Sequence, residues 1–242
     1  MSNETSPGIS AFLDQLDMEH HFRYERKYTL VATSKQQALF SIKTHPALFR
    51  EIFHSRQINN IYFDTPGMFA YLDNKIGISE RQKVRIRWYN GTFGDIPKPQ
   101  LEFKIKQGLV GDKWTFPLPP FQLEKGVDQH FFQHLFQKAN LPSPVYQFLR
   151  KLEPTLLNTY QRSYFRSVDQ RFRLTLDDTM VYYKMGGFYN TFLCKHNAKE
   201  RYVIEVKYAL ETDDQADQIG NHFNFRMDKH SKYVNGIDFT WA

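Results

Sequence analysis

Basic and apolar residues alternate in the stretch KVRIRWY, residues 83 to 89. Successive side chains of a β-strand point to opposite faces. Lys83, Arg85 and Arg87 would therefore share one face of a strand, and the apolar residues between and after them would share the other. Three cations on one face make this strand a candidate for binding an anion.

The same alternation recurs in five other segments that are rich in β-branched and aromatic residues. The residues predicted on their charged faces are Arg23, Glu25, Lys27, Glu102, Lys104, Lys106, Tyr160, Arg162, Tyr164, Arg171, Arg173, Thr175, Asp177, Glu205 and Lys207. One such face alone most often points to solvent. Like charges about 7 Å apart repel by roughly 2 kcal/mol at an effective dielectric constant of 20, and a sheet that only had to be soluble would mix the two signs. Several basic faces together therefore favour a site for a large anion.

The carboxylates on these faces allow two interpretations. Glu25, Glu102 and Glu205 can pair with neighbouring lysine and arginine side chains, or they can hold Mg²⁺ or Mn²⁺, which prefer oxygen ligands. Such ions are commonly held by one or two carboxylates together with substrate phosphates. The pattern predicts binding of phosphoryl groups, with their transfer as a further role.

The elements that carry these residues are mostly strands. Aromatic residues make up 16% of the chain, and seven strand-like runs contain many of them: FRYERKYTL, INNIYFDT, KVRIRWY, LEFKIKQ, NTYQRSYF, FRLTLDD and YVIEVKYAL. Capping-box spacing or apolar periodicity predicts helices at residues 33–44, 127–139 and 212–224. Turn residues at 90–99, 108–111 and 186–187 separate strands. These features predict a single α+β domain on an antiparallel sheet or barrel.

Composition narrows the class of protein. The chain has 242 residues, 41% of them hydrophobic, with a net charge of +6, so a globular protein with an anionic partner is expected. The single cysteine, Cys194, excludes an intramolecular disulfide and a cysteine-based zinc cluster. No leader or membrane-spanning segment is recognised, which predicts a cytoplasmic protein. Nucleic acid is disfavoured because the aromatic residues mostly fall on the faces opposite the cations.

An ordered set of motifs resembles the VTC domain, the polyphosphate polymerase domain of the vacuolar transporter chaperone family. The motifs are RYERKY, IYFDTP, KVRIRWY, LEFKIKQG, TYQRSYF, RLTLDD, VIEVKY and SKYVNG. The family belongs to the CYTH-like triphosphate tunnel metalloenzymes. The resemblance implies a closed antiparallel eight-stranded β-barrel wrapped by helices at residues 22–242, preceded by a helical or flexible segment at residues 1–21.

The resemblance also implies roles for residues that match the family motifs. Arg85, Arg87, Lys104 and Arg162 are expected to be catalytic. Lys27, Lys113, Lys207, Lys232 and Arg173 are expected to bind phosphate. Glu205 matches the acid that holds Mn²⁺ or Mg²⁺, and Glu25 and Glu102 are additional candidates from the strand pattern. The first acidic position of the wider superfamily is Arg23 here, which favours the VTC branch over the triphosphatase and cyclase branches. Lys83 lies outside the matched positions and is expected at the tunnel mouth.

The implied function is a polyphosphate polymerase that transfers the γ-phosphate of ATP to inorganic polyphosphate. Two alternatives stay open: a metal-dependent inorganic or nucleoside triphosphatase, and a polyphosphate-binding module without turnover. The membrane segments of the eukaryotic complexes are not found in this sequence, which is typical of a freestanding, bacterial member. A membrane protein is then a candidate partner, and the oligomeric state is left open.

Overall fold

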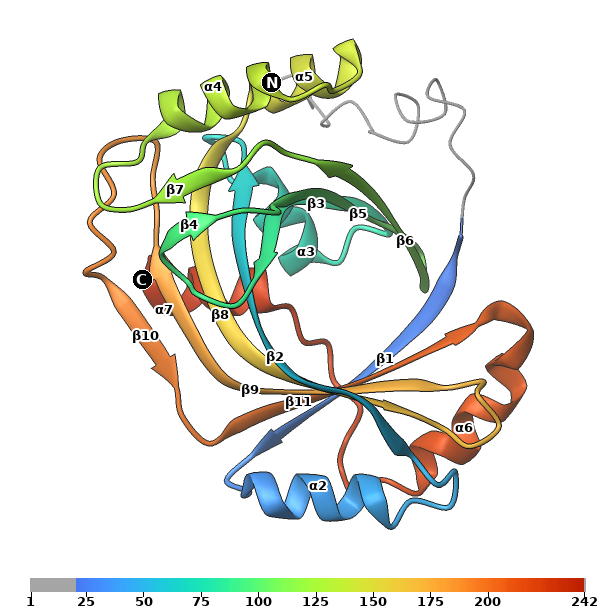
Figure 1. Cartoon of the computed structure of the whole chain (residues 1–242). Coiled ribbons are helices and arrows are strands. Elements are labelled where there is room, and N and C mark those ends of the chain that lie inside the picture. Colours follow the sequence, from blue (N-terminus) through green and yellow to red (C-terminus); the bar gives the residue numbers. More distant parts are fainter. Residues whose placement is uncertain (1–20, 242) are drawn as a thin grey trace.

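Eight antiparallel strands form a closed ring in residues 21–241, the part of the chain that the computed structural model describes (Figure 1). Around the ring the order is β9, β11, β1, β6, β5, β3, β2 and β8, which pairs again with β9. The strands are β1 (Arg23–Val31), β2 (Arg50–Asp64), β3 (Glu80–Tyr89), β5 (Gln100–Gln107), β6 (Val110–Pro117), β8 (Glu153–Arg166), β9 (Arg173–Lys184) and β11 (Arg201–Ala209). The predicted closed eight-stranded antiparallel arrangement is confirmed. The predicted N-terminal segment, except its last residue, lies outside the described residues.

Three short strands and six α-helices complete the described part of the chain. They are β4 (Gly94–Ile96), β7 (Phe121–Leu123), β10 (Lys195–Ala198), α2 (Lys35–Lys43), α3 (Phe69–Ile76), α4 (Gln129–Lys138), α5 (Ser143–Leu149), α6 (Asp213–Asn221) and α7 (Lys232–Thr240), with a 3-10 turn at Leu210–Thr212. The three helices expected from the sequence are present. The capping box of α2 uses Ser34 and Gln37, one residue later than predicted, because the Ser34 hydroxyl accepts the Gln37 amide.

Two hydrophobic clusters cover the outside of the ring. In the first, the outward residues of β2, β3 and β5, such as Phe63, Ile86 and Phe103, pack against α4 and α5. In the second, outward residues of β1, β9 and β11, such as Leu174, pack against buried side chains of α2 and α6. The apolar half of the alternating pattern therefore faces these helices, and the charged half faces the interior of the ring.

Helix α7 fills part of the ring interior. Tyr233 and Ile237 of α7 belong to one buried cluster with Tyr62, Leu156 and Tyr182, which come from the inward faces of β2, β8 and β9. Figure 1 shows α7 beside β8 and β9. The helix is anchored by Tyr233, whose hydroxyl donates a 2.6 Å hydrogen bond to Asp64. None of the described helices is long and apolar enough to cross a membrane.

The ring has one weak junction, between β1 and β6. Only two residue pairs join these strands, whereas β1 and β11 share nine. Past this junction, the chain leading to α7 lies against the free edge of β1: Met227 bridges to Tyr28, and the Asp228 amide donates to the Lys27 carbonyl at 2.9 Å. The C-terminal segment thus completes the wall where β1 and β6 separate.

Candidate functional site

Strand register brings the predicted charged residues together on the inner surface of the ring. Lys27 stands opposite Glu205, Arg85 opposite Glu102, and Lys104 opposite both Lys83 and Lys113. The inward-facing cations of this surface are Lys27, Lys83, Arg85, Arg87, Lys104, Lys113, Arg162 and Lys207, and Lys232 joins them from α7. The inward carboxylates are Glu25, Glu102, Asp177 and Glu205. The cations outnumber the carboxylates, so the interior carries an excess of positive charge.

Glu102 holds the first group of cations. Its carboxylate accepts from Arg85 Nε at 2.8 Å and Lys113 Nζ at 2.9 Å, and Arg87 Nε lies 3.7 Å away. Burial alone would raise the pKa of Glu102, but these three cations outweigh burial and hold it well below its usual value. Glu102 is therefore a fixed negative charge that orients the guanidinium groups.

Uncharged side chains complete the positioning of the two arginines. Arg87 Nε donates to Asn60 Oδ1 at 2.9 Å and its terminal nitrogen to the Tyr160 hydroxyl at 3.3 Å, while Arg85 donates to the Tyr62 hydroxyl at 3.2 Å. No role is predicted from the sequence for any of these three partners. Tyr160 was placed on a charged face by alternation, but nothing in the sequence showed which cation it would contact.

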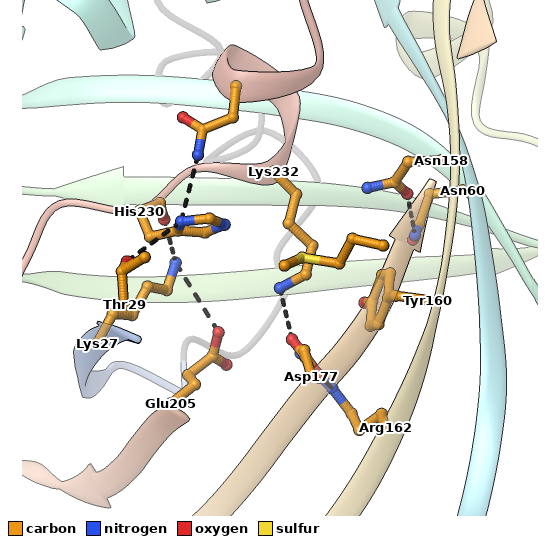
Figure 2. A network of polar contacts seen from close by, with 12 residues as sticks. Lys27, Thr29, Asn60, Asn158, Tyr160, Arg162, Asp177, Glu205, His230 and Lys232 are labelled. Carbon is orange, nitrogen blue, oxygen red and sulfur yellow. Dashed lines mark hydrogen bonds and ion pairs between the residues drawn. The ribbon is translucent and has the colours of Figure 1, made fainter. Parts of the chain in front are cut away.

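Glu25 and Glu205 form the second group with three lysines. Lys27 Nζ lies 2.7 Å from Glu25 and 3.8 Å from Glu205, and Lys207 Nζ lies 2.6 Å from Glu205 and 3.9 Å from Glu25. Lys104 Nζ donates to Glu25 at 2.8 Å. Burial raises the pKa of each carboxyl, and Glu25 raises that of Glu205 further, yet the ammonium groups lower both below the usual value. Figure 2 shows Lys27 reaching toward Glu205.

Lys104 is the lysine of this group whose pKa is lowered by its surroundings. Burial and the neighbouring ammonium groups of Lys27 and Lys207 lower its pKa to about 7, despite the opposing attraction of Glu25 and Glu205. Its side chain is still one-third exposed. An anion bound beside Lys104 would favour the charged form, so its charge depends on what the ring contains.

Asp177 organises the third group, at the side of the ring filled by α7. Arg162 donates two hydrogen bonds to this carboxylate, of 2.5 Å to Oδ1 and 2.7 Å to Oδ2, and Lys232 Nζ lies 2.5 Å from Oδ2 (Figure 2). Asp177 is fully buried, and the two cationic side chains are each 9% exposed. Burial would raise the pKa of Asp177, but Arg162 and Lys232 lower it. Alternation placed Asp177 on the charged face, yet no role was predicted for it.

Two of the predicted cations, Arg173 and Lys83, belong to none of these three carboxylate groups. Arg173 pairs in register with Lys207 but is exposed, at the end of the ladder. Lys83 is partly exposed; its Nζ donates to Ser231 Oγ, the N-cap of α7, at 2.7 Å, and burial together with Lys27 and Lys104 lowers its pKa well below the usual value. Its place at the tunnel mouth stays a prediction.

Of the three candidate metal ligands, Glu25 and Glu205 lie together as a pair, whereas Glu102 has other partners. Glu25 and Glu205 share the same two lysines, each within 4 Å, so a common cation can reach both, whereas Glu102 is engaged by Arg85 and Lys113. In residues 21–241 no cluster of three or more His, Cys, Asp or Glu side chains is placed to hold a metal. Two carboxylates completed by phosphate oxygens is a donor set that suits Mg²⁺ or Mn²⁺. The residues fit such an ion.

The domain is thus a closed antiparallel ring whose interior is lined by cations and by paired carboxylates. The family model described as the VTC domain matches residues 22–240, and the chain therefore belongs to the VTC domain family. The resemblance noted in the sequence motifs is thus confirmed. No curated protein matches the chain in sequence.

Several solved structures are similar to this chain over most of its length. A Hippeastrum protein described as an adenylyl cyclase with a dominant triphosphatase activity is 16% identical, with a TM-score of 0.49 and coverage of 89% of this chain and 95% of that one. A Bacillus halodurans protein described as an adenylate cyclase is also 16% identical, with a TM-score of 0.47 and coverage of 90% of this chain and 98% of that one. The capping enzyme triphosphatase of Mimivirus is 10% identical, with a TM-score of 0.36 and coverage of 91% and 95%.

Proposed function

We propose that the protein is a polyphosphate polymerase, which transfers the γ-phosphoryl group of ATP to the end of an inorganic polyphosphate chain and releases ADP. The observation that carries this proposal is the excess of inward-facing cations held by buried, ionised carboxylates. A surface of this kind would suit a long polyanion, because the arginines that Glu102 and Asp177 hold remain charged and oriented before the anion arrives. The match to the VTC domain family over residues 22–240 supports the same proposal.

Phosphoryl transfer depends mainly on positioning and on stabilising negative charge. Arg85 and Arg87 would hold the oxygens of the transferred group, since Glu102 and Asn60 fix their guanidiniums. Lys104 and Arg162 would hold the phosphates on either side. The attacking group is an ionised phosphate oxygen, so no general base is needed.

Other residues would extend the binding surface along the chain of phosphates. Lys27, Lys113, Lys207 and Lys232 are proposed to contact bridging and terminal phosphates, and Arg173 to meet the polyanion at the edge. Glu205 and Glu25 would hold Mg²⁺ or Mn²⁺. Such an ion would supply positive charge that offsets the charge developing on the transferred group.

The assay for this proposal is incubation of the purified protein with ATP and Mn²⁺ or Mg²⁺, followed by measurement of ADP, free phosphate and polymer. ADP matched by polymer supports the polymerase. Free phosphate without polymer would replace it with the triphosphatase, although Glu25 and Glu102 are poorly suited to activate water because cations lower the pKa of both. Polyphosphate binding without turnover would indicate a binding module.

Two variants test the site itself. Arg87→Ala and Glu205→Gln are expected to lower turnover at least about a hundredfold while the fold is kept, because each removes charge at the proposed reacting group. Arg171→Gln is the matched control: this exposed arginine lies outside the ring interior, 4.0 Å from Asp169 and within a 2.7 Å hydrogen bond of the Gln215 side chain on α6. Wild-type turnover in either site variant would contradict the assignment.

A further inference from the structure

His230 lies inside the ring, in the segment that leads into α7, and the proposed mechanism gives it no role. It is 5% exposed, and its carbonyl accepts a 3.0 Å hydrogen bond from Lys27 Nζ. In Figure 2 its imidazole lies between the side chains of Lys27 and Lys232. The imidazole of His230 is thus placed among residues that are proposed to bind phosphate.

The neighbours of Nδ1 determine which tautomer His230 adopts. Asn235 Nδ2, which can only donate, lies 3.2 Å from Nδ1, and the Thr29 hydroxyl lies 3.3 Å from it. Nδ1 must therefore be the nitrogen without a proton. In a neutral imidazole the proton is then on Nε2.

The Nε2 atom of His230 has no hydrogen-bond partner among the described residues, although it is buried. Leaving a buried donor unpaired costs about 1–3 kcal/mol, so such groups are rare without a reason. Burial and the charges of Lys232 and Lys27 lower the pKa of the imidazole to about 3, so it stays neutral near pH 7. In Figure 2 this second nitrogen points toward the side chain of Lys232.

We propose that His230 Nε2–H donates a hydrogen bond to a non-bridging phosphoryl oxygen of a polyphosphate or triphosphate chain held between Lys27 and Lys232. The inference deepens the proposed function and rests on it. His230 would be a positioning residue of a particular kind: a neutral donor with a fixed direction among charged lysines, aimed by Thr29 and Asn235. A phosphoryl oxygen fits this donor because it accepts hydrogen bonds and carries the charge that the surrounding cations require.

Two substitutions separate the donor from the rest of the side chain. His230→Asn keeps an acceptor near the Nδ1 position for Thr29 and Asn235 but has nothing at Nε2, whereas His230→Gln can place an amide N–H near Nε2. Tripolyphosphate binding is measured by calorimetry at pH 7.5. We expect about a tenfold to hundredfold loss of affinity for His230→Asn, the range for one hydrogen bond to a charged acceptor, and a smaller loss for His230→Gln. Urea unfolding of each variant checks the fold.

A spectroscopic measurement on the wild-type protein does not depend on the variants folding. Long-range proton–nitrogen correlation of ¹⁵N-histidine should show a neutral ring protonated at Nε2, with the Nε2–H signal shifting when tripolyphosphate is added. If the wild type binds tripolyphosphate but His230→Asn binds equally well, or the signal stays unchanged, the role of His230 is overturned and the proposed function stands. If the wild type does not bind tripolyphosphate, the proposed function itself fails.

Discussion

At the scale of single residues, the inward carboxylates Glu25, Glu102, Asp177 and Glu205 each contact more than one cation. Glu102 contacts Arg85 and Lys113, and Asp177 contacts Arg162 and Lys232. A lysine or arginine that is desolvated without a counter-charge costs several kcal/mol, so these carboxylates allow the cations to stand ready before a phosphate arrives. The carboxylates are therefore part of the binding surface even though they repel the anion.

Asp177 gives the sharpest test of this dependence. Asp177→Asn keeps the shape of the side chain but leaves Arg162 and Lys232 with no buried carboxylate to hold them. We expect the free energy of unfolding to fall by about 3 kcal/mol, since breaking a buried ion pair strands the remaining charge. Urea denaturation measures this loss, and the surface variant Arg171→Gln should change little. A stability equal to wild type would show that Arg162 does not need Asp177.

His230 makes a prediction about pH. Its pKa is lowered to about 3 in the folded protein, whereas an unfolded histidine titrates near pH 6.5. Between these values the unfolded state binds a proton that the folded state does not, so the free energy of unfolding falls as pH decreases. From pH 6.5 to 4.5 this one group contributes a loss of about 2 to 3 kcal/mol.

The measurement is urea unfolding of the wild type and His230→Asn at several pH values. The variant lacks the titrating ring, so it should lose less stability on acidification, while above pH 7 the difference between the two proteins should be constant. The buried carboxylates also lose stability in acid, but they are present in both proteins. Parallel pH curves would mean that the pKa of His230 is the same in the folded and the unfolded protein.

At the scale of elements, alternation found the strands that have a charged and an apolar face, and it failed where the pattern is interrupted. Strand β6 was missed because Gly111 and Asp112 break the alternation in VGDKWTFP. Helix α7 was missed because Gly236 and Asn235 are poor helix formers in the middle of a nine-residue segment. Packing inside the ring decides the structure of α7, and no local pattern in the sequence reports that packing.

Gly236 shows why α7 carries a residue that weakens a helix. A Cβ atom at this position would lie 2.3 Å from Leu156 Cδ2 and 2.7 Å from Tyr182 Cδ1. We expect Gly236→Ala to lower the free energy of unfolding by about 1 to 3 kcal/mol through overpacking, even though alanine favours helix. Gly186→Ala is the control, since a Cβ there meets nothing within 4 Å. A stabilised Gly236→Ala protein would mean that α7 does not sit against β8 and β9.

At the scale of the whole molecule, the interior is unevenly accessible. Near β5 and β6 the side chains of Lys104 and Lys113 are about one-third exposed, at 33% and 36%, whereas Arg162 and Lys232 beside α7 are 9% exposed. The exposed groups lie on the strands next to the weak junction of β1 and β6. An anion that contacts Lys27 on β1 and Lys113 on β6 would link the two sides of this junction by charge rather than by backbone hydrogen bonds.

The closure of the ring should therefore respond to the ligand. In the free protein we expect the amide that faces β1 in the Val110–Gly111 segment to exchange hydrogen faster than those of the eight-pair ladder between β3 and β5, because two residue pairs provide little protection on that side. Tripolyphosphate should slow exchange at the junction several-fold and more than in the β2–β3 ladder, since only at the junction does it add a new connection. Hydrogen exchange with mass spectrometry measures both, at matched ionic strength.

Lys113→Gln should reduce the added protection and Arg171→Gln should not. Uniform protection around the ring would instead mean that the ligand stabilises the fold without bridging β1 and β6.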